Sequence, residues 1–404
     1  MTTIPLKYVA RINAGQSPPS AEVSELVAGR PFLQGNAEFR EANPSARYQC
    51  DAAPKVASVG DVLLSVRAPV GALNIADLSY GIGRGLCAVT AIDCDARFLW
   101  WWLHYARPEL DAVSTGTTYR AITSEDVGAL SFPVLSRKEQ RRIADFLDAE
   151  TARIDRLSIL QRSAIQKLDE RESAQLDLGI NEFMESHGVV PLRRFLLGVD
   201  QGVSPQCDAV PAADEEWGVL KVSCLRPGLF IPSENKRLPA EVEPDQGSEV
   251  REGDLLIVRA NTPQLVGSTA VVPQVRRRLL LSDKIFRVRL DGRIAANFVA
   301  TVARGRRIRA LCAAGSNGAS QSMANIRFEE VKAWPIPAAG LDAQADFVTR
   351  VAEERAALDR LRPQIERQLA LLAERRQALI TAAVTGQFDV STASGRNVTE
   401  GITV

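Results

Sequence analysis

The chain has 404 residues, of which 46% are hydrophobic and 24% charged, and its 49 basic and 49 acidic side chains give a formal net charge of zero. This composition is typical of a globular protein with two or three domains, and the zero net charge excludes a protein that coats nucleic acid by bulk attraction alone. Because no run of about 18 apolar residues is present and the first residues lack the pattern of a signal peptide, we expect a cytoplasmic protein without a membrane partner.

Residues 1–135 are predicted to form a first globular domain. Short apolar runs at 61–67 and 86–92 lie between Gly and Pro residues, as strands do. The segment 97–106 contains three consecutive tryptophans and indicates a buried helix, since neighbouring side chains point in different directions around a helix and cannot form one stacking face. The glycine-rich segment 81–85 resembles a cofactor loop only superficially, and we expect a tight turn there.

A long polar helix is predicted after the first domain. Pro133 marks the end of that domain. Ser136 followed by Glu139 has the spacing of a capping box. Neither Gly nor Pro occurs again before Gly179, so we expect the helix to stop at this glycine, within a helical region spanning 136–185.

Residues 186–338 repeat the plan of the first domain, with strands expected at 254–259 and 285–290. The stretch 276–309 carries eleven basic residues against two acidic ones. Such a net positive stretch fits contacts with phosphate groups, although a solvated arginine-rich surface explains it equally well.

A second polar helix is predicted at 339–390, followed by a flexible tail at 391–404. Pro363 should kink this helix or start a new segment. Apolar residues of both helices form a narrow, partly heptad seam, which suits contact between helices. We therefore expect the two helices to pair as an antiparallel coiled coil.

The chain contains the same arrangement twice. A shift of 204 positions places Ile122 on Ile326, Val127 on Val331, Pro133 on Pro337 and Gln140 on Gln344. Upstream, the match continues with small insertions, as in Gly15-Gln16-Ser17-Pro18 and Gly202-Val203-Ser204-Pro205. A repeat of this length is a duplicated domain rather than a solenoid unit. The predicted fold is α+β, with two similar globular α/β domains, two long helices between them and a pseudo-two-fold internal repeat.

No combination of residues in the sequence indicates catalysis. A P-loop is missing, and Glu330-Val331-Lys332 lacks the acidic partner that a nuclease E-x-K motif needs. The two histidines, His104 and His187, occupy non-equivalent places, which argues against a shared triad or a histidine metal site. The six cysteines are scattered and are expected to be buried free thiols. We expect no catalytic residue, no metal and no cofactor.

Both helical regions resemble those of type I restriction–modification specificity subunits. The resemblance rests on Glu139-Gln140-Arg141-Arg142-Ile143-Ala144-Asp145-Phe146-Leu147-Asp148 with Ile154-Asp155-Arg156-Leu157, and on Leu379-Ile380-Thr381-Ala382-Ala383-Val384-Thr385-Gly386. It covers essentially the whole chain and departs from the family pattern at 343–347.

This resemblance implies a non-catalytic subunit. Each globular part is then a target-recognition domain that binds one half of a split, asymmetric site in double-stranded DNA, and the helices fix the gap between the halves. It also implies two modification subunits, which carry S-adenosylmethionine and methylate adenine, and restriction subunits that hydrolyse ATP.

Candidate DNA-binding residues lie at matching places in the two halves. Two polar, glycine-containing loops at 114–120 and 316–322 precede the last strand of each domain, and two arginines close strands that we take as equivalent. The candidates are Arg67, Thr117, Thr118, Tyr119, Arg120, Arg259, Arg276, Arg277, Arg278, Asn317, Ser320 and Gln321. An alternative is a coiled-coil scaffold that binds only protein partners; salt-dependent binding of duplex DNA would separate the two functions.

Overall fold

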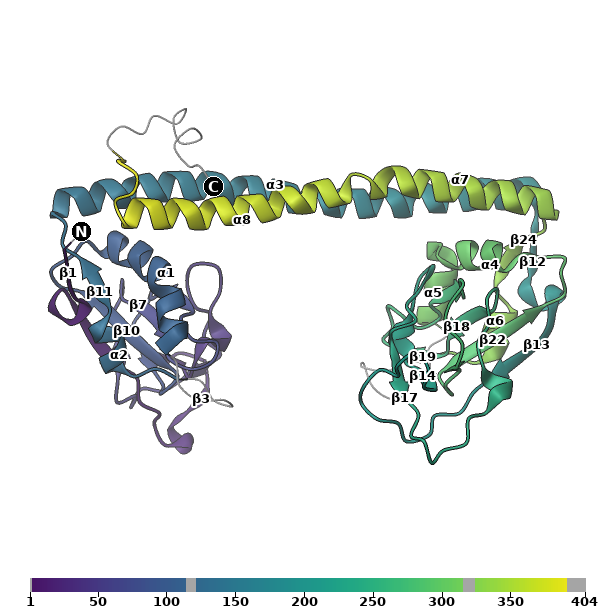
Figure 1. Cartoon of the computed structure of the whole chain (residues 1–404), viewed down its shortest axis with the longest axis horizontal. Coiled ribbons are helices and arrows are strands. Elements are labelled where there is room, and N and C mark those ends of the chain that lie inside the picture. The colour runs from purple at the N-terminus through teal and green to yellow at the C-terminus, as the bar shows by residue number, and fades with distance from the viewer. Residues whose placement is uncertain (1, 114–120, 315–323, 391–404) are drawn as a thin grey trace. The chain divides into compact units, whose positions relative to one another are not determined.

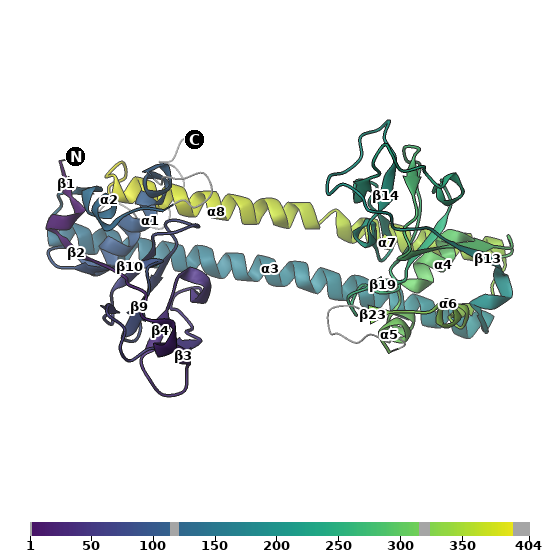
Figure 2. The same ribbon diagram turned by 90° about the horizontal axis from the view of Figure 1, so that it is seen from below.

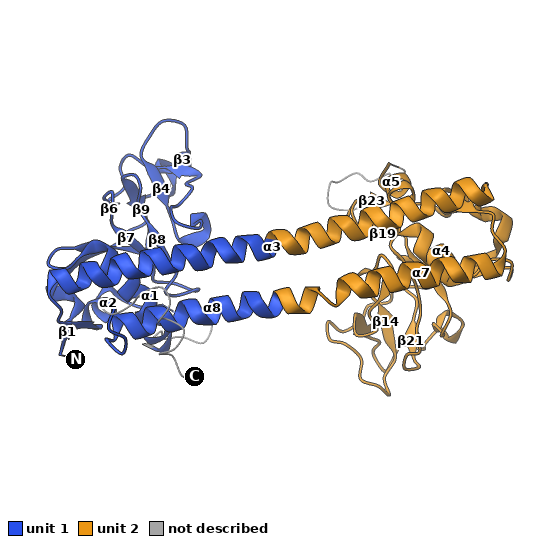
Figure 3. Ribbon diagram, turned by 90° about the horizontal axis from the view of Figure 1, so that it is seen from above, with its two compact units in different colours: residues 1–162, 366–404 blue, residues 163–365 orange. Residues whose placement is uncertain are grey.

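The computed structural model describes residues 2–113, 121–314 and 324–390. It divides into two compact units: unit 1 comprises residues 1–162 with 366–404, and unit 2 comprises residues 163–365 (Figure 3). Both unit boundaries fall inside the helical regions, so each unit contains one globular part together with a piece of each helical region.

Unit 1 is built on a four-stranded antiparallel sheet. Its strands run in the order β2 (Ala10–Ala14), β10 (Leu86–Ala91), β7 (Val62–Ser65) and β8 (Leu73–Ile75). A second sheet has the order β3 (Ser24–Glu25), β5 (Tyr48–Gln49), β4 (Pro31–Leu33), β9 (Tyr80–Ile82) and β6 (Val56–Ala57), and β1 (Thr3–Pro5) pairs with β11 (Ser131–Pro133). The strands expected near 61–67 and 86–92 are therefore confirmed.

Unit 2 has a main sheet of the same topology. Its order is β13 (Leu196–Gln201), β22 (Ile285–Leu290), β18 (Leu255–Val258) and β20 (Thr269–Val271). Smaller sheets join β17 (Asn235–Arg237), β14 (Gly218–Leu220) and β21 (Leu279–Leu280), β15 (Leu225–Arg226) with β16 (Leu229–Phe230), β19 (Ala260–Asn261) with β23 (Ala324–Asn325), and β12 (Val189–Pro191) with β24 (Pro335–Pro337). The internal repeat predicted from the sequence is thus present in the fold.

A buried helix lies between the main sheet and the long helices in each unit. In unit 1 this is α1 (Ala96–Val113), whose Trp101 and Trp102 are 5% and 1% exposed, which confirms the core role expected for the tryptophans. In unit 2 the place is taken by α4 (Ala296–Ala303), followed by α5 (Arg306–Ala314). Two short helices, α2 (Ser124–Ala129) and α6 (Phe328–Lys332), precede the last strands.

The first long helix, α3, spans Arg137–His187. The capping box is confirmed, because the backbone N–H of Ser136 donates to Glu139 and the backbone N–H of Glu139 donates to Ser136 Oγ. The predicted stop at Gly179 is wrong. A glycine inside a helix costs only about 1 kcal/mol relative to alanine. Gly179 lies close to Phe347: a Cβ atom at position 179 would be 3.7 Å from the Phe347 ring, an ordinary contact distance. The helix ends instead before Gly188, which has a φ of +71°.

The second helical region is broken as Pro363 predicts. Helix α7 spans Leu341–Asp359, and α8 spans Arg362–Val384 with the proline in its first turn. In both units these helices run antiparallel to α3. In unit 1, Asp155 pairs with Arg376 and Gln161 with Gln368. In unit 2, Asp169 pairs with Arg362 and Glu172 with Arg355. Figures 1 and 2 both show α8 alongside α3 within unit 1.

The long helices contribute directly to the hydrophobic core of each unit. In unit 1 the buried cluster includes α3 residues such as Leu147 and α8 residues such as Ile380. In unit 2 it includes Ile180 of α3 and Phe347 of α7. The apolar face of each helix pair is therefore covered by its own globular part.

One glutamine in each unit joins the globular part to a long helix. In unit 1, Gln140 accepts from the backbone N–H of Asp95 at 2.6 Å and donates to the carbonyl of Leu135 at 3.0 Å. In unit 2, Gln344 accepts from the N–H of Ala295 at 2.8 Å. Both side chains are almost fully buried, at 3% and 1% exposure. The repeat aligned these glutamines, and the fold gives them the same role.

We expect Gln344→Ala to lower the free energy of unfolding of unit 2 by about 1–3 kcal/mol, because it leaves a buried N–H and the carbonyl of Ala339 without partners. Chemical denaturation followed by circular dichroism measures this. The matched control, Gln364→Ala, removes an exposed glutamine of the same unit and should change the value by under about 0.5 kcal/mol. Equal effects of both substitutions would contradict a structural role for Gln344.

Candidate nucleic-acid interface

Seven of the sequence-predicted DNA-binding residues lie outside the described residues. They belong to the two polar loops and comprise Thr117, Thr118, Tyr119, Arg120, Asn317, Ser320 and Gln321. Their contacts stay predictions. The other five are placed by the structure.

Arg67 and Arg259 are not structural equivalents. The N–H of Ile122 donates to the carbonyl of Val66, and the N–H of Ile326 donates to that of Arg259, so Arg259 corresponds to Val66. Arg67 is instead matched by Ala260, since they lie opposite Ala121 and Asn325 respectively. The sequence alignment was off by one position because it matched the identical Arg-Ala pairs, whereas the strand pairing keeps one constant shift from Gly60/Gly253 through Val66/Arg259.

The two arginines also differ in their surroundings. Arg67 is exposed, and its guanidinium has no partner among the described residues. Arg259 is half-buried and its Nη1 lies 3.5 Å from the carbonyl oxygen of Asp283. Arg67 is therefore available to an anionic ligand, whereas Arg259 is partly engaged within its own unit.

The three consecutive arginines at 276–278 differ in their partners. Arg276 donates to the backbone carbonyl of Glu216 at 2.9 Å, and Arg278 forms an ion pair with the Glu215 carboxylate at 3.0 Å. Arg278 also has a positive φ of 67°. Arg277 is exposed and its side chain has no partner in the described part of the chain. Of the three, Arg277 has the guanidinium most available for phosphate.

Most of the remaining positive charge in 276–309 is neutralised within unit 2. The ion pairs are Lys284–Asp283, Arg287–Asp200, Arg289–Asp200, Arg293–Asp291, Arg304–Glu172 and Arg306–Asp177. Several of the carboxylates lie far away in the sequence, which is why a local charge count overestimates the positive surface here.

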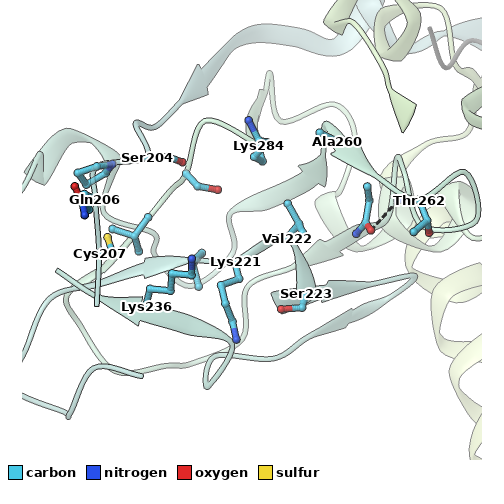
Figure 4. A pocket seen from close by; sticks show the side chains of 15 residues that line it. Ser204, Gln206, Cys207, Lys221, Val222, Ser223, Lys236, Ala260, Thr262 and Lys284 are labelled. Carbon is cyan, nitrogen blue, oxygen red and sulfur yellow. Dashed lines mark hydrogen bonds between the residues drawn. The ribbon is translucent and has the colours of Figure 1, made fainter. Parts of the chain in front are cut away.

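Unit 2 contains a cleft that sequence reasoning missed. Its volume is about 590 Å³, and its lining includes Lys221, Lys236 and Lys284 from three separate segments (Figure 4). The lining also includes the polar side chains of Ser204, Gln206, Ser223, Asn261, Thr262 and Ser282, together with Pro205, Cys207, Val219, Leu220, Val222 and Ala260. The lysines are isolated in the sequence, so no motif or charge run signals their convergence.

The electrostatic state of the cleft is set by how each lysine is paired. Lys221 lies 2.7 Å from Glu234, and the hydrogen bond from Lys221, followed by that from Ser223, lowers the pKa of this carboxyl. Burial alone would raise the pKa of Asp283, but hydrogen bonds from Lys284 and Ser204 and the nearby positive charges lower it. Lys236 is exposed and has no described partner, so the cleft holds three ammonium groups against two carboxylates.

The geometry suits an anionic, hydrogen-bonding ligand. Exposed ammonium groups bind phosphate as point charges, and amide and hydroxyl groups can contact sugar, phosphate or base edges. Among the described residues, no cluster of His, Cys, Asp or Glu could hold a metal ion. Nor does any helix of the described chain have the length and apolar character needed to cross a membrane.

Comparisons with known proteins match part of this chain. A family model for the type I restriction modification DNA specificity domain matches residues 2–162. The putative type I restriction enzyme MjaX specificity subunit of Methanocaldococcus jannaschii is 34% identical over 170 residues, which are 42% of this chain and 39% of that protein. Residues 2–162 are therefore similar to the DNA specificity domain of type I restriction–modification systems.

Other specificity subunits are similar over comparable lengths. The type I restriction enzyme EcoEI specificity subunit of Escherichia coli is 28% identical over 173 residues, 42% of this chain and 29% of that protein. The solved HsdS subunit from Thermoanaerobacter tengcongensis shares 41% identity over 37% of each chain, with a TM-score of 0.35. The matches thus span well under two thirds of the length of these relatives.

The half-buried His104 is unsuited to proton transfer at neutral pH. His104 packs between Trp100 and Trp101 on α1. Burial, followed by the charges of Arg376 and Arg107, lowers the pKa of His104 to about 3 from its ordinary 6.5. The imidazole is therefore neutral over the physiological range and acts as a core side chain.

This lowered pKa predicts a pH dependence of stability. The pKa of His104 is lower in the folded than in the unfolded state. The free energy of unfolding is therefore highest above pH 6.5 and falls as the pH drops towards 3, because protonation favours the unfolded state. When the pH falls from 7 to 5, His104 should lower the free energy of unfolding by about 2 kcal/mol. The thermal unfolding midpoint of unit 1 should fall between pH 7 and 5, and this fall should be smaller in His104→Gln than in the unchanged protein. His187→Gln, at an exposed histidine, is the control and should leave the shift intact.

Proposed function

We propose that this chain recognises a bipartite, asymmetric target in double-stranded DNA, with one half-target bound by each unit. The observation that carries the proposal is the repeated main sheet, joined in both units to the long helices through an equivalent buried glutamine. Two similar frames in one chain suit a target of two parts. The units are recognition domains, and catalysis belongs to other subunits.

Available positive groups in both units support DNA as the ligand. Unit 1 offers Arg67, and unit 2 offers Lys236 in the cleft and Arg277 on a neighbouring surface. We propose that these groups contact phosphate and that the loops at 114–120 and 316–322 contribute base contacts. Arg259, Arg276 and Arg278 remain proposed contacts, but their existing partners leave fewer free donors.

We further propose that the long helices pair as an antiparallel coiled coil that fixes the gap between half-targets. Within unit 1, α3 pairs with α8, and within unit 2, α3 pairs with α7 and the start of α8, in each case antiparallel. Exposed apolar side chains on these helices, among them Ile159, Leu160 and Leu371, are 53–60% exposed and suit contact with partner helices. We assign this surface to two modification subunits that methylate adenine and to an ATP-dependent restriction subunit, in the cytoplasm.

The first test is the salt dependence of DNA binding. Lys236→Ala should weaken binding to all duplex sequences alike and reduce the slope of log affinity against log salt by about 0.9, since one phosphate contact is lost. Fluorescence anisotropy with a random duplex at several salt concentrations measures it. Lys332→Ala is the matched control, because Lys332 is paired with Glu329 outside the cleft and should leave the slope unchanged. Salt-independent binding by the unchanged protein would favour the protein-scaffold alternative.

The second test concerns the gap. Four residues inserted after Gln161 and four before Gln368 keep this hydrogen-bonded pair opposite each other while lengthening both helices by about 6 Å. One base pair advances about 3.4 Å, so the gap should grow by about one or two base pairs with both half-targets unchanged. Sequencing methylated sites in cells carrying the insertion measures the gap. An active complex with the original gap would show that the helices do not set the spacing.

A further inference from the structure

Three residues at the edge of the unit 2 cleft, Lys221, Asp283 and Lys284, form what we call its rim. Unit 1 has corresponding positions next to equivalent strands. In unit 1 the N–H of Leu86 donates to the carbonyl of Gly83, and in unit 2 the N–H of Ile285 donates to that of Ser282. These bonds close turns at the start of β10 and β22, which occupy the same place in their sheets. The predicted tight turn at 81–85 is confirmed, and it corresponds to the segment 280–284.

The neighbouring segment is matched in the same way. A parallel strand pair places Phe32 opposite Gly81 in unit 1 and Val219 opposite Leu280 in unit 2. Counting two residues onward, Gln34 corresponds to Lys221. Glycine is needed under both rims, because a Cβ at Gly15 would lie 2.2 Å from the carbonyl oxygen of Gly83, and one at Gly202 would lie 1.9 Å from that of Leu281.

The side chains on this common frame differ in hydrogen-bonding character. Arg84 in unit 1 is exposed and has no partner among the described residues. At the matching position unit 2 has Asp283, which bonds Ser204 and Lys284. Unit 1 therefore has an arginine, which can only donate hydrogen bonds, where unit 2 has an aspartate paired with the neighbouring Lys284.

The second matched position shows the same contrast. Gln34 is exposed and donates to Ser17 Oγ at 2.8 Å, which leaves its amide oxygen as an acceptor. Lys221 has donors only and lies beside Glu234. Gln140 and Gln344 are identical in the two units, whereas the side chains at these matched rim positions differ in charge and in hydrogen-bonding groups.

We propose that Gln34 and Arg84 in unit 1, and Lys221 with the Asp283–Lys284 pair in unit 2, are specificity-determining residues that read bases in the two half-targets. This inference rests on the proposed DNA recognition. The chemistry is that of direct readout: arginine and lysine donate to guanine O6 and N7, and glutamine pairs with the N6 and N7 edge of adenine. Different side chains on one frame explain how two similar units select different half-targets.

The test uses the full chain with one substitution in each unit, each taken from the other unit. Arg84→Asp removes no contact of the described residues, and Lys221→Gln removes one ion pair with a half-exposed lysine. Bound duplexes are selected from a randomised library and sequenced. Lys332→Gln changes charge outside the rim and is the control. Arg84→Gln is a second variant in case Arg84→Asp does not fold, and thermal unfolding checks each protein.

We expect Arg84→Asp to change base preference by roughly tenfold at one or more positions of one half-target, and Lys221→Gln to do so in the other half only. Unchanged preferences in both folded variants would overturn the inference, as would a uniform loss of affinity with a lower salt slope, which marks a phosphate contact. If the unchanged chain selects no bipartite sequence, the proposed function itself fails, which is a distinct result.

Discussion

The structure depends on one requirement: the apolar face of each pair of long helices must be covered by a globular part. The helices are otherwise polar, and their buried residues belong to the same clusters as the sheet and its covering helix. The long helices complete one hydrophobic cluster in each unit, while further clusters lie wholly within the globular parts. The proposed recognition surface is thus carried by packed sheets, which suits base readout, since a base contact fails when its donor moves by about an ångström.

The duplication separates what the fold needs from what the surface selects. Gln140 and Gln344, which bond backbone groups between a globular part and a long helix, are the same in both units. Gly15 and Gly202 are likewise both close to a backbone carbonyl, whereas Gly83 and Gly85 correspond to Ser282 and Lys284. The rim residues can differ between the units because their side chains bond only to other exposed or half-exposed side chains, as Lys221 does to Glu234. A duplicated frame can thus acquire two specificities without a change of fold.

Sequence reasoning identified the features that depend on local or periodic patterns. The repeat, the capping box at Ser136 and the helix break at Pro363 all follow from residues close together in the chain. It failed at Gly179, where packing against Phe347 outweighs low helix propensity, and at Arg67 and Arg259, where only strand pairing fixes the register. The cleft could not be predicted from the sequence, because Lys221, Lys236 and Lys284 come from separate segments and line one cleft only in the folded chain.

The proposed binding of a polyanion is compatible with a net charge of zero because charge is unevenly paired. A positive residue that is paired with a carboxylate of its own unit, as Arg287 is with Asp200, adds rigidity and little external field. Lys236, Arg67 and Arg84 are exposed and have no partner among the described residues. Such groups can contact phosphate, which adds affinity that does not depend on sequence. Discrimination between sequences must then come from contacts to base edges.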